Sequence, residues 1–274
     1  MTSVDGEPDA AASRANKSSR LRALLDLLAE QGRLSVSAAA DTLGVSEATV
    51  RRDFNSLAKQ QLVTRTHGGV VASSVAYDLP VRYRGRGDDA KDRIAAAAAQ
   101  LVRPSEVVGF NGGTTTSSTA RTLAARADLA EASSHPGLTV VTNALNIAAE
   151  MVLRPHIRTV SLGGIARPQS YELVGPLATM VLRDLWVDRL FLGVDGFTAD
   201  AGASCFHEGE AAVNALMVER ASDVTVVATA DKLGRRTFAR ICDTAKVSTL
   251  VTDSTADEAY VSQLESLGVR VVVA

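Results

Sequence analysis

The sequence contains little cysteine, and its histidines are not spaced like metal ligands. Cys205 and Cys242 are the two cysteines among 274 residues, too few for a disulfide framework or a cysteine-based metal cluster. The four histidines show no ligand spacing either. We therefore expect no structural metal and no cofactor.

Long apolar runs are also missing. No stretch approaches the roughly 20 residues that a helix needs to cross a bilayer, and the polar, acidic N-terminus is unlike a signal peptide. Residues 1–15 are expected to be disordered, because they offer little apolar surface to bury. Hydrophobic residues nevertheless make up 46% of the chain, enough for a real core. These features predict a cytoplasmic protein with a small domain followed by a larger one.

Charge is unevenly distributed along the chain. The overall formal charge is −2, yet residues 14–75 contain nine basic and five acidic residues, a net charge of +4. The remainder is therefore −6. A basic segment on an acidic body is typical of modular DNA-binding proteins, because the basic part is attracted to phosphates.

The most informative pattern in the basic segment is the run SEATVRRDF at residues 46–54. Val50, Phe54 and Leu57 recur at helical spacing and predict one apolar stripe, and Ser46 is a good N-cap. The opposite face carries Ala48, Arg52, Asn55 and Lys59. Arginine can read guanine edges, asparagine can read adenine and lysine can hold phosphate. Taken alone, this could equally be an ordinary amphipathic helix with a solvated basic face.

The flanking sequence favours DNA binding. A leucine-rich helix is predicted over residues 19–31, a short helix over 37–43 and a tight turn at Gly44-Val45. Residues 62–64 then predict a strand, and Gly68-Gly69 permits a sharp reversal into a second strand. This order is that of a winged helix-turn-helix, which we place at residues 16–74, with a linker at 75–90. The predicted DNA contacts are Ser46, Ala48, Thr49, Arg51, Arg52, Asn55, Lys59, Arg65 and His67.

From residue 91 to 274, short β-branched runs alternate with helical patterns. The alternation predicts an α/β domain built on a doubly wound, mostly parallel sheet. The predicted strands are Val107–Phe110, Thr139–Thr142, Thr159–Leu162, Leu190–Val194, Thr225–Thr229, Thr249–Thr252 and Val269–Val273. The predicted helices are Ala90–Leu101, Thr116–Ala125, Ala144–Val152, Pro176–Leu185, Glu210–Ala221 and Glu258–Leu267.

Glycines and polar side chains follow several of these strands. Asn111-Gly112-Gly113-Thr114-Thr115-Thr116 opens a helix, where converging N–H groups favour an anion. Each such segment could be a simple turn or cap, but together they predict a site for a small polar anion at the carboxyl edge of the sheet. No Walker or Rossmann glycine motif is present, which disfavours a nucleoside triphosphatase. The predicted effector contacts are Gly112, Gly113, Thr114, Thr115, Asn143, Gly163, Gly164, Asp195 and Lys232.

The chain resembles the DeoR family of bacterial transcriptional regulators. The resemblance rests on residues 45–53 and 67–69, and then on GTTT at 113–116, VTN at 141–143, LGG at 162–164, VGP at 174–176, FLGVDG at 191–196, EAAV at 210–213 and DK at 231–232. It implies a winged helix-turn-helix, a sensor domain related in fold to ribose-5-phosphate isomerase, and control by a phosphorylated sugar or polyol.

This sequence departs from the family pattern at four positions. Phe54 and Gln61 stand where the family usually has Leu and Gly, Asn111 stands for a common Asp, and Asn214 for a frequent Lys. The resemblance further implies a repressor of a sugar or polyol catabolic operon that binds double-stranded operator DNA as a homo-oligomer, either a dimer or a tetramer.

An enzyme is the alternative hypothesis. A sugar-phosphate isomerase with a DNA-binding appendage would need a carboxylate base, which Asp195, Glu208 or Glu210 could supply. The absence of a carboxylate at Asn111 argues against this alternative, and we favour a regulator without catalytic residues. A DNA shift without turnover of ribose 5-phosphate would separate the two.

Overall fold

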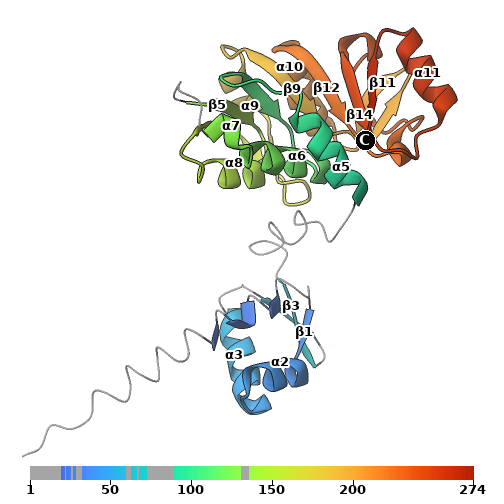
Figure 1. Ribbon diagram of the computed structural model, residues 1–274. Helices are drawn as coiled ribbons and strands as arrows, with labels where there is room; N and C mark the ends of the chain where they lie inside the picture. The colour runs from blue at the N-terminus through green and yellow to red at the C-terminus, as the bar shows by residue number, and fades with distance from the viewer. Residues whose placement is uncertain are drawn as a thin grey trace, which may run out of the picture. The chain divides into compact units, whose positions relative to one another are not determined.

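The computed structural model describes residues 20–274 apart from 22, 26, 29–32, 60–62, 67, 73–88 and 131–135 (Figure 1). The chain divides into two compact units, which we call the N-terminal unit (Met1–Arg84) and the C-terminal unit (Gly85–Ala274). The predicted disordered N-terminus and most of the predicted linker lie outside the described residues. The first described element of the C-terminal unit, α5, begins at Asp89.

The N-terminal unit is a winged helix-turn-helix, as predicted. The described residues from 20 to 28 are helical, and they are followed by β1 (Arg33–Ser35), α2 (Val36–Leu43), α3 (Glu47–Lys59), β2 (Val63–Thr66) and β3 (Gly69–Ala72). The three strands form an antiparallel sheet in the order β1-β3-β2. The hydrophobic core of the N-terminal unit includes Leu24, Leu28, Val50 and Phe54.

Local sequence explains the turns of this unit. The backbone N–H of Ala38 donates to Oγ of Ser35, which caps α2, and Gly44 ends the helix in the left-handed conformation at φ +63°. Gly68 has a φ of +88°, and a Cβ on Gly69 would lie 2.3 Å from the carbonyl oxygen of Leu34. The two glycines therefore allow both the reversal between β2 and β3 and the close pairing of β3 with β1.

The C-terminal unit is built on a seven-stranded sheet whose pairings are all parallel. The strands are β4 (Val107–Phe110), β5 (Leu138–Thr142), β6 (Ile157–Ser161), β9 (Val187–Leu192), β12 (Ala221–Val227), β14 (Thr249–Thr252) and β15 (Arg270–Val273). Their order, β15-β14-β12-β9-β4-β5-β6, reverses direction between β4 and β9. Doubly wound sheets bind their ligands at such a switch point.

Helices cover both faces of this sheet (Figure 1). One face carries α5 (Asp89–Ala99), α6 (Thr114–Ala124), α7 (Ala127–Ala130) and α8 (Leu145–Met151), and the other carries α9 (Pro176–Leu182), α10 (Glu208–Glu219) and α11 (Glu258–Ser266). Alternate residues of β9 serve the two cores: Phe191 packs on the first face, Leu190 and Leu192 on the second.

All seven predicted strands and all six predicted helices of this unit are present. The strands Val107–Phe110 and Thr249–Thr252 have their predicted bounds, and the other elements have shifted ends. The helix predicted to reach Ala221 ends at Glu219, because Ala221 already begins β12. The structure adds a hairpin of β7 (Ile165–Ala166) and β8 (Leu173–Val174), a small sheet of β10 (Gly196–Thr198), β11 (Gly202–Cys205) and β13 (Ala239–Cys242), and the 3₁₀ turns η1 (Ala230–Lys232) and η2 (Thr244–Lys246). In the described part of the chain, no helix has both the length and the apolar character needed to cross a bilayer.

Candidate functional sites

The exposed face of α3 carries most of the predicted DNA contacts. Val50 and Phe54 are fully buried, whereas Ala48, Arg52 and Asn55 are exposed. The N-cap is also as predicted, since the backbone N–H of Thr49 donates to Oγ of Ser46 at 3.3 Å. The sequence pattern thus builds a rigid helix that presents a polar, basic face to solvent.

Two predicted DNA contacts hold each other in place. Nη1 of Arg65, on β2, donates to Oδ1 of Asn55 at 2.5 Å and so connects the wing to α3. On the same helix, Arg51 forms an exposed ion pair with Glu47 at 3.1 Å. The side chain of Lys59 and all of His67 lie outside the described residues. The side-chain oxygen of Asn55 therefore accepts a hydrogen bond from within the unit.

A buried ion pair fixes the first helix to α3. Asp53 is 2% exposed, and one of its carboxylate oxygens accepts from Nε of Arg20 at 2.6 Å. Asp53 belongs to the motif at residues 46–54, but its role was not predicted. The signal was its position three residues after Val50, on the buried side of the helix, where a carboxylate needs a partner.

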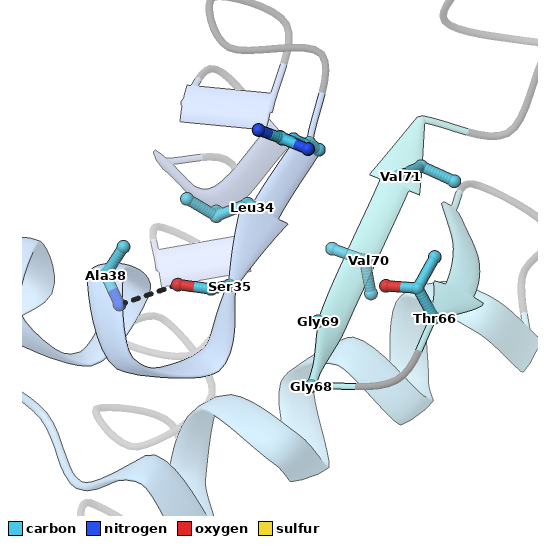
Figure 2. Close-up of a pocket in the computed structure, with 9 residues that line it drawn as sticks. Leu34, Ser35, Ala38, Thr66, Gly68, Gly69, Val70 and Val71 are labelled. Carbon is cyan, nitrogen blue, oxygen red and sulfur yellow. Dashed lines mark hydrogen bonds between the residues drawn. The ribbon is translucent and has the colours of Figure 1, made fainter.

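A shallow groove of about 590 Å³ lies beside the wing (Figure 2). Figure 2 shows Leu34 and Ser35 on β1, Val70 on the neighbouring strand β3, and the hydrogen bond from Ala38 of α2 to Ser35. Its lining residues are Arg33, Leu34, Ser35, Ala38, Thr66, Gly68, Gly69, Val70 and Val71. The described DNA-contact residues of α3 lie outside this groove.

In the C-terminal unit, the predicted glycine loop lies at the switch point of the sheet. Asn111 follows β4 and Gly193 follows β9. The Asn111 side chain accepts from the N–H of Gly193 at 2.7 Å and donates to the Gly193 carbonyl at 3.0 Å. An ionised aspartate could not make both bonds, so the asparagine ties the two strand ends together.

The glycine loop leads directly into α6. Gly113 precedes the helix with a φ of +137°, and α6 begins at Thr114 as the anion hypothesis requires. Thr115 is 3% exposed, and its hydroxyl has no hydrogen-bond partner among the described residues. The helix N-terminus and an unpaired buried hydroxyl therefore lie within one turn of each other.

A buried carboxylate packs against this loop. Glu172, 3% exposed, accepts from the backbone N–H of Gly112 at 2.8 Å and from the amides of Asn143 at 3.1 Å and Asn214 at 3.3 Å. Burial, reinforced by the charge of Glu210, raises the pKa of Glu172 from 4.5 to about 7. Neither Glu172 nor Asn214 is among the predicted effector contacts. The sequence identifies Asn214 only as a departure from the family pattern.

Glu210 belongs to a neighbouring polar cluster. Its Oε1 accepts from Nε of Arg167 at 2.7 Å and from the hydroxyl of Ser170 at 2.5 Å. This ion pair engages the carboxylate of Glu210, the residue that the enzyme hypothesis names as a possible base, and connects α10 to the hairpin of β7 and β8.

Lys232 and Asp195 lie together after β12 and β9. Nζ of Lys232 donates to the carbonyl of Val194 at 2.6 Å, and Asp195 accepts from the N–H of Phe206 at 3.1 Å. Burial lowers the pKa of Lys232, and the charge of Asp195 opposes that change. Asp195 therefore lies on the segment that continues from Gly193, and Lys232 contacts that segment from η1.

Gly163 and Gly164 follow β6. In the described part of the chain, neither glycine forms a hydrogen bond with the buried side chains of Glu172, Asn143 and Asn214. Gly164 has a φ of +133°, and a Cβ there would lie 2.6 Å from the Val174 carbonyl oxygen, so this glycine permits packing against β8. Among all the described residues, no group of three or more histidine, cysteine or acidic side chains is arranged to hold a metal ion.

Two protein families match the chain. Residues 20–75 match the DeoR-like helix-turn-helix domain, and residues 87–254 match the DeoR C terminal sensor domain. The HTH-type transcriptional regulator GlpR of Haloferax volcanii is 31% identical over 255 residues, covering 92% of this chain and 96% of that protein. The glycerol-3-phosphate regulon repressor of Escherichia coli is 26% identical over 236 residues, covering 86% and 90%.

Solved structures match less closely. The sorbitol operon regulator SorC of Klebsiella pneumoniae has 13% identity and a TM-score of 0.41 over 89% of this chain and 97% of that one. Ribose 5-phosphate isomerase A of Methanocaldococcus jannaschii has 18% identity and a TM-score of 0.39, covering 53% of this chain and 54% of that one.

Proposed function

Because the chain belongs to the DeoR family of DNA-binding transcriptional regulators, we propose that it represses a sugar or polyol catabolic operon under the control of a phosphorylated effector. Its relatives along nearly the whole chain are named regulators or repressors, so it is a regulator and not an enzyme. The observation that carries the proposal is that one chain contains both an exposed basic face on α3 and a glycine loop at the switch point of its large sheet.

DNA recognition is assigned to α3 and the wing. With its apolar stripe buried in the unit, α3 would enter the major groove of an operator, where Arg52 would read a base edge. Arg51 would release Glu47, and Asn55 would exchange Arg65 for a base. Both of these contacts are exposed, so water competes for them and their exchange costs little.

Effector binding is assigned to the carboxyl edge of the large sheet. The N-terminus of α6 supplies backbone N–H groups and the Thr115 hydroxyl supplies an unpaired donor, which together suit a phosphate. Lys232 adds a positive charge from the β12 side. Asn143, Gly163, Gly164 and Asp195 complete the proposed site.

A second copy of the chain is the proposed assembly partner. Helix α9 exposes Leu177 and Met180 at 59% each and Val181 at 41%, and contiguous apolar side chains of this kind mark interaction surfaces. Helix-turn-helix proteins read paired half-sites as dimers. A dimer or tetramer in the cytoplasm, bound to operator DNA, fits these features.

The DNA assignment is tested with Arg52→Ala. We expect its affinity for a mapped operator to fall by about 1–3 kcal/mol with relaxed base preference, as measured by fluorescence anisotropy. Arg154→Ala, an exposed arginine of the other unit, is the matched control and should bind like wild type. Wild-type affinity in Arg52→Ala would refute the groove assignment.

The effector assignment is tested by melting the protein with a panel of sugar and polyol phosphates. A true effector at 100 times its Kd should add about 2.7 kcal/mol, a shift of several degrees. Lys232→Ala and Thr115→Ala should reduce this shift, whereas Lys246→Ala, an exposed lysine, should keep it. If no member of the panel changes either the melting point or the DNA affinity, the sensor assignment fails.

A further inference from the structure

The buried cluster of Glu172, Asn143 and Asn214 has no part in the phosphate contacts proposed above. Its three side chains are 3%, 0% and 1% exposed. They come from the hairpin, from the end of β5 and from α10, and they meet beside the glycine loop. We call these three residues the carboxamide cluster.

Stability does not account for the carboxamide cluster. Removing a carboxylate from water is costly unless an opposite charge compensates, and the three groups that donate to Glu172 are neutral amides. The nearby carboxylate of Glu210 adds repulsion, because its charge contributes to the raised pKa of Glu172. An apolar side chain or a glutamine would be the more stable choice here. Buried groups of this kind are typical of functional sites.

The cluster also holds unused hydrogen-bonding capacity. The Asn143 amide donates to both Glu172 and Asn214, while its Oδ1 is buried and has no partner among the described residues. The Thr115 hydroxyl is likewise buried and unpartnered. Unsatisfied buried polar atoms are rare in folded proteins and call for an explanation such as an absent ligand.

The cluster is continuous with the proposed phosphate site. The N–H of Gly112, two residues before the start of α6, donates to Glu172. A Cβ on Gly112 would lie 2.5 Å from Cγ of Glu172, so only glycine permits this approach. A ligand with its phosphate at α6 would therefore extend its carbon chain toward the carboxamide cluster.

We propose that Glu172, Asn143 and Asn214 bind the hydroxyl groups of the effector's carbon chain, so that the effector is a polyhydroxylated phosphate ester rather than a simple organophosphate. The inference rests on the proposed function. Adjacent hydroxyls can donate to the Glu172 carboxylate and to Asn143 Oδ1, and can accept from the amide N–H groups.

The test compares wild type with Glu172→Gln by calorimetry, using inorganic phosphate and a panel of three- to six-carbon sugar and polyol phosphates. For the panel member that binds wild type best, we expect Glu172→Gln to raise Kd about 10- to 100-fold, the loss typical of a hydrogen bond to a charged group. The Kd of inorganic phosphate should stay within about twofold. Glu265→Gln, an exposed carboxylate of the same unit, is the matched control.

Deoxy analogues of that panel member sharpen the test. Removing the hydroxyl that Glu172 binds should strongly reduce the affinity of the wild type for the analogue. The affinity of Glu172→Gln should change little, because this variant has already lost the carboxylate that binds the hydroxyl. Asn214→Ala provides a second variant if Glu172→Gln does not fold, with a smaller increase in Kd expected.

Two outcomes would overturn the inference while leaving the proposed function intact. In one, the panel member binds wild type and both variants equally well. In the other, the variants bind inorganic phosphate as much more weakly as they bind the sugar phosphate, which would give the cluster a structural role. If no panel member binds wild type, the proposed function and this inference fail together.

Discussion

The two units present their functional side chains in opposite ways. In the N-terminal unit, the candidate residues are exposed on one face of α3 and fall within a short stretch of sequence. In the C-terminal unit, Glu172, Asn143 and Asn214 are buried and come from three distant segments. The candidate surface for DNA is thus encoded locally, whereas the candidate interior site is assembled by topology.

The two units also differ in how much core supports each site. Among the described residues, one hydrophobic cluster lies in the N-terminal unit, while the C-terminal unit has one cluster on each face of its sheet. The small unit therefore depends more heavily on each large buried side chain.

The largest effect should come from Phe54→Ala. Phe54 is fully buried, and such a truncation costs about 3–5 kcal/mol, enough to unfold a small unit. Hydrogen exchange measured by mass spectrometry should show amide protection lost in residues 33–72 and retained in 89–274. Asn55→Ala, its exposed neighbour, should leave protection unchanged. Loss of protection in both units would contradict their independence.

The next effect concerns pH and Glu172. Its pKa is raised to about 7 in the folded protein from 4.5, so the folded state holds this proton more tightly than the unfolded chain does. The stabilisation is therefore complete below pH 4.5 and is lost as the pH rises through about 7, a change of about 3 kcal/mol.

Glu172→Gln should remove this pH dependence and should make the C-terminal unit more stable than wild type at pH 8. Urea denaturation between pH 5 and 8 measures it, with Glu265→Gln as the control. Parallel stability curves for wild type and Glu172→Gln would show that Glu172 is ionised throughout.

A smaller effect is expected from Arg20→Ala. This substitution leaves the Asp53 carboxylate, 2% exposed, without its ion-pair partner. We expect a loss of about 1–3 kcal/mol, between the values for buried and surface pairs, since Arg20 is partly exposed. Arg51→Ala removes the exposed pair on the same helix and should cost less than about 0.5 kcal/mol. Equal losses would mean that burial does not distinguish the two pairs.

The smallest effect is that of Ser46→Ala at the N-cap of α3. Losing the bond from the Thr49 N–H to Oγ of Ser46 should cost about 1 kcal/mol. Thermal melting of Ser46→Ala beside Ser46→Asp, which preserves the cap, measures this cost. A Ser46→Asp variant as unstable as Ser46→Ala would exclude capping as the role of Ser46.

Much of the fold could be predicted from the sequence because its elements carry strong local signals. The stripe of Val50, Phe54 and Leu57 identified α3, and β-branched runs identified every strand of the large sheet. The strand β1 was missed, since three residues between two helical patterns are too few to show alternation. The small sheet of β10, β11 and β13 was missed because its strands are short and partly built from glycine, serine and threonine.

The candidate site was predicted only where the chain order reveals it. The glycine loop follows β4 directly and could be recognised, but Glu172 lies 60 residues from Gly112 and 29 from Asn143. No motif in the run Tyr171–Val174 indicates that its carboxylate turns inward. Asn214 could be noted as unusual, yet its partner could be found only in three dimensions.

The strand order also matters while the ribosome is making the chain. Strands β4, β5 and β6 are neighbours in the sheet and are synthesised one after another, so they can pair as they emerge. The other edge of β4 pairs with β9, which is synthesised only after α8, the hairpin and α9. During this interval the edge is open to pairing with other chains. A nascent chain thus carries a complete helix-turn-helix unit before the candidate effector site of its sheet can form.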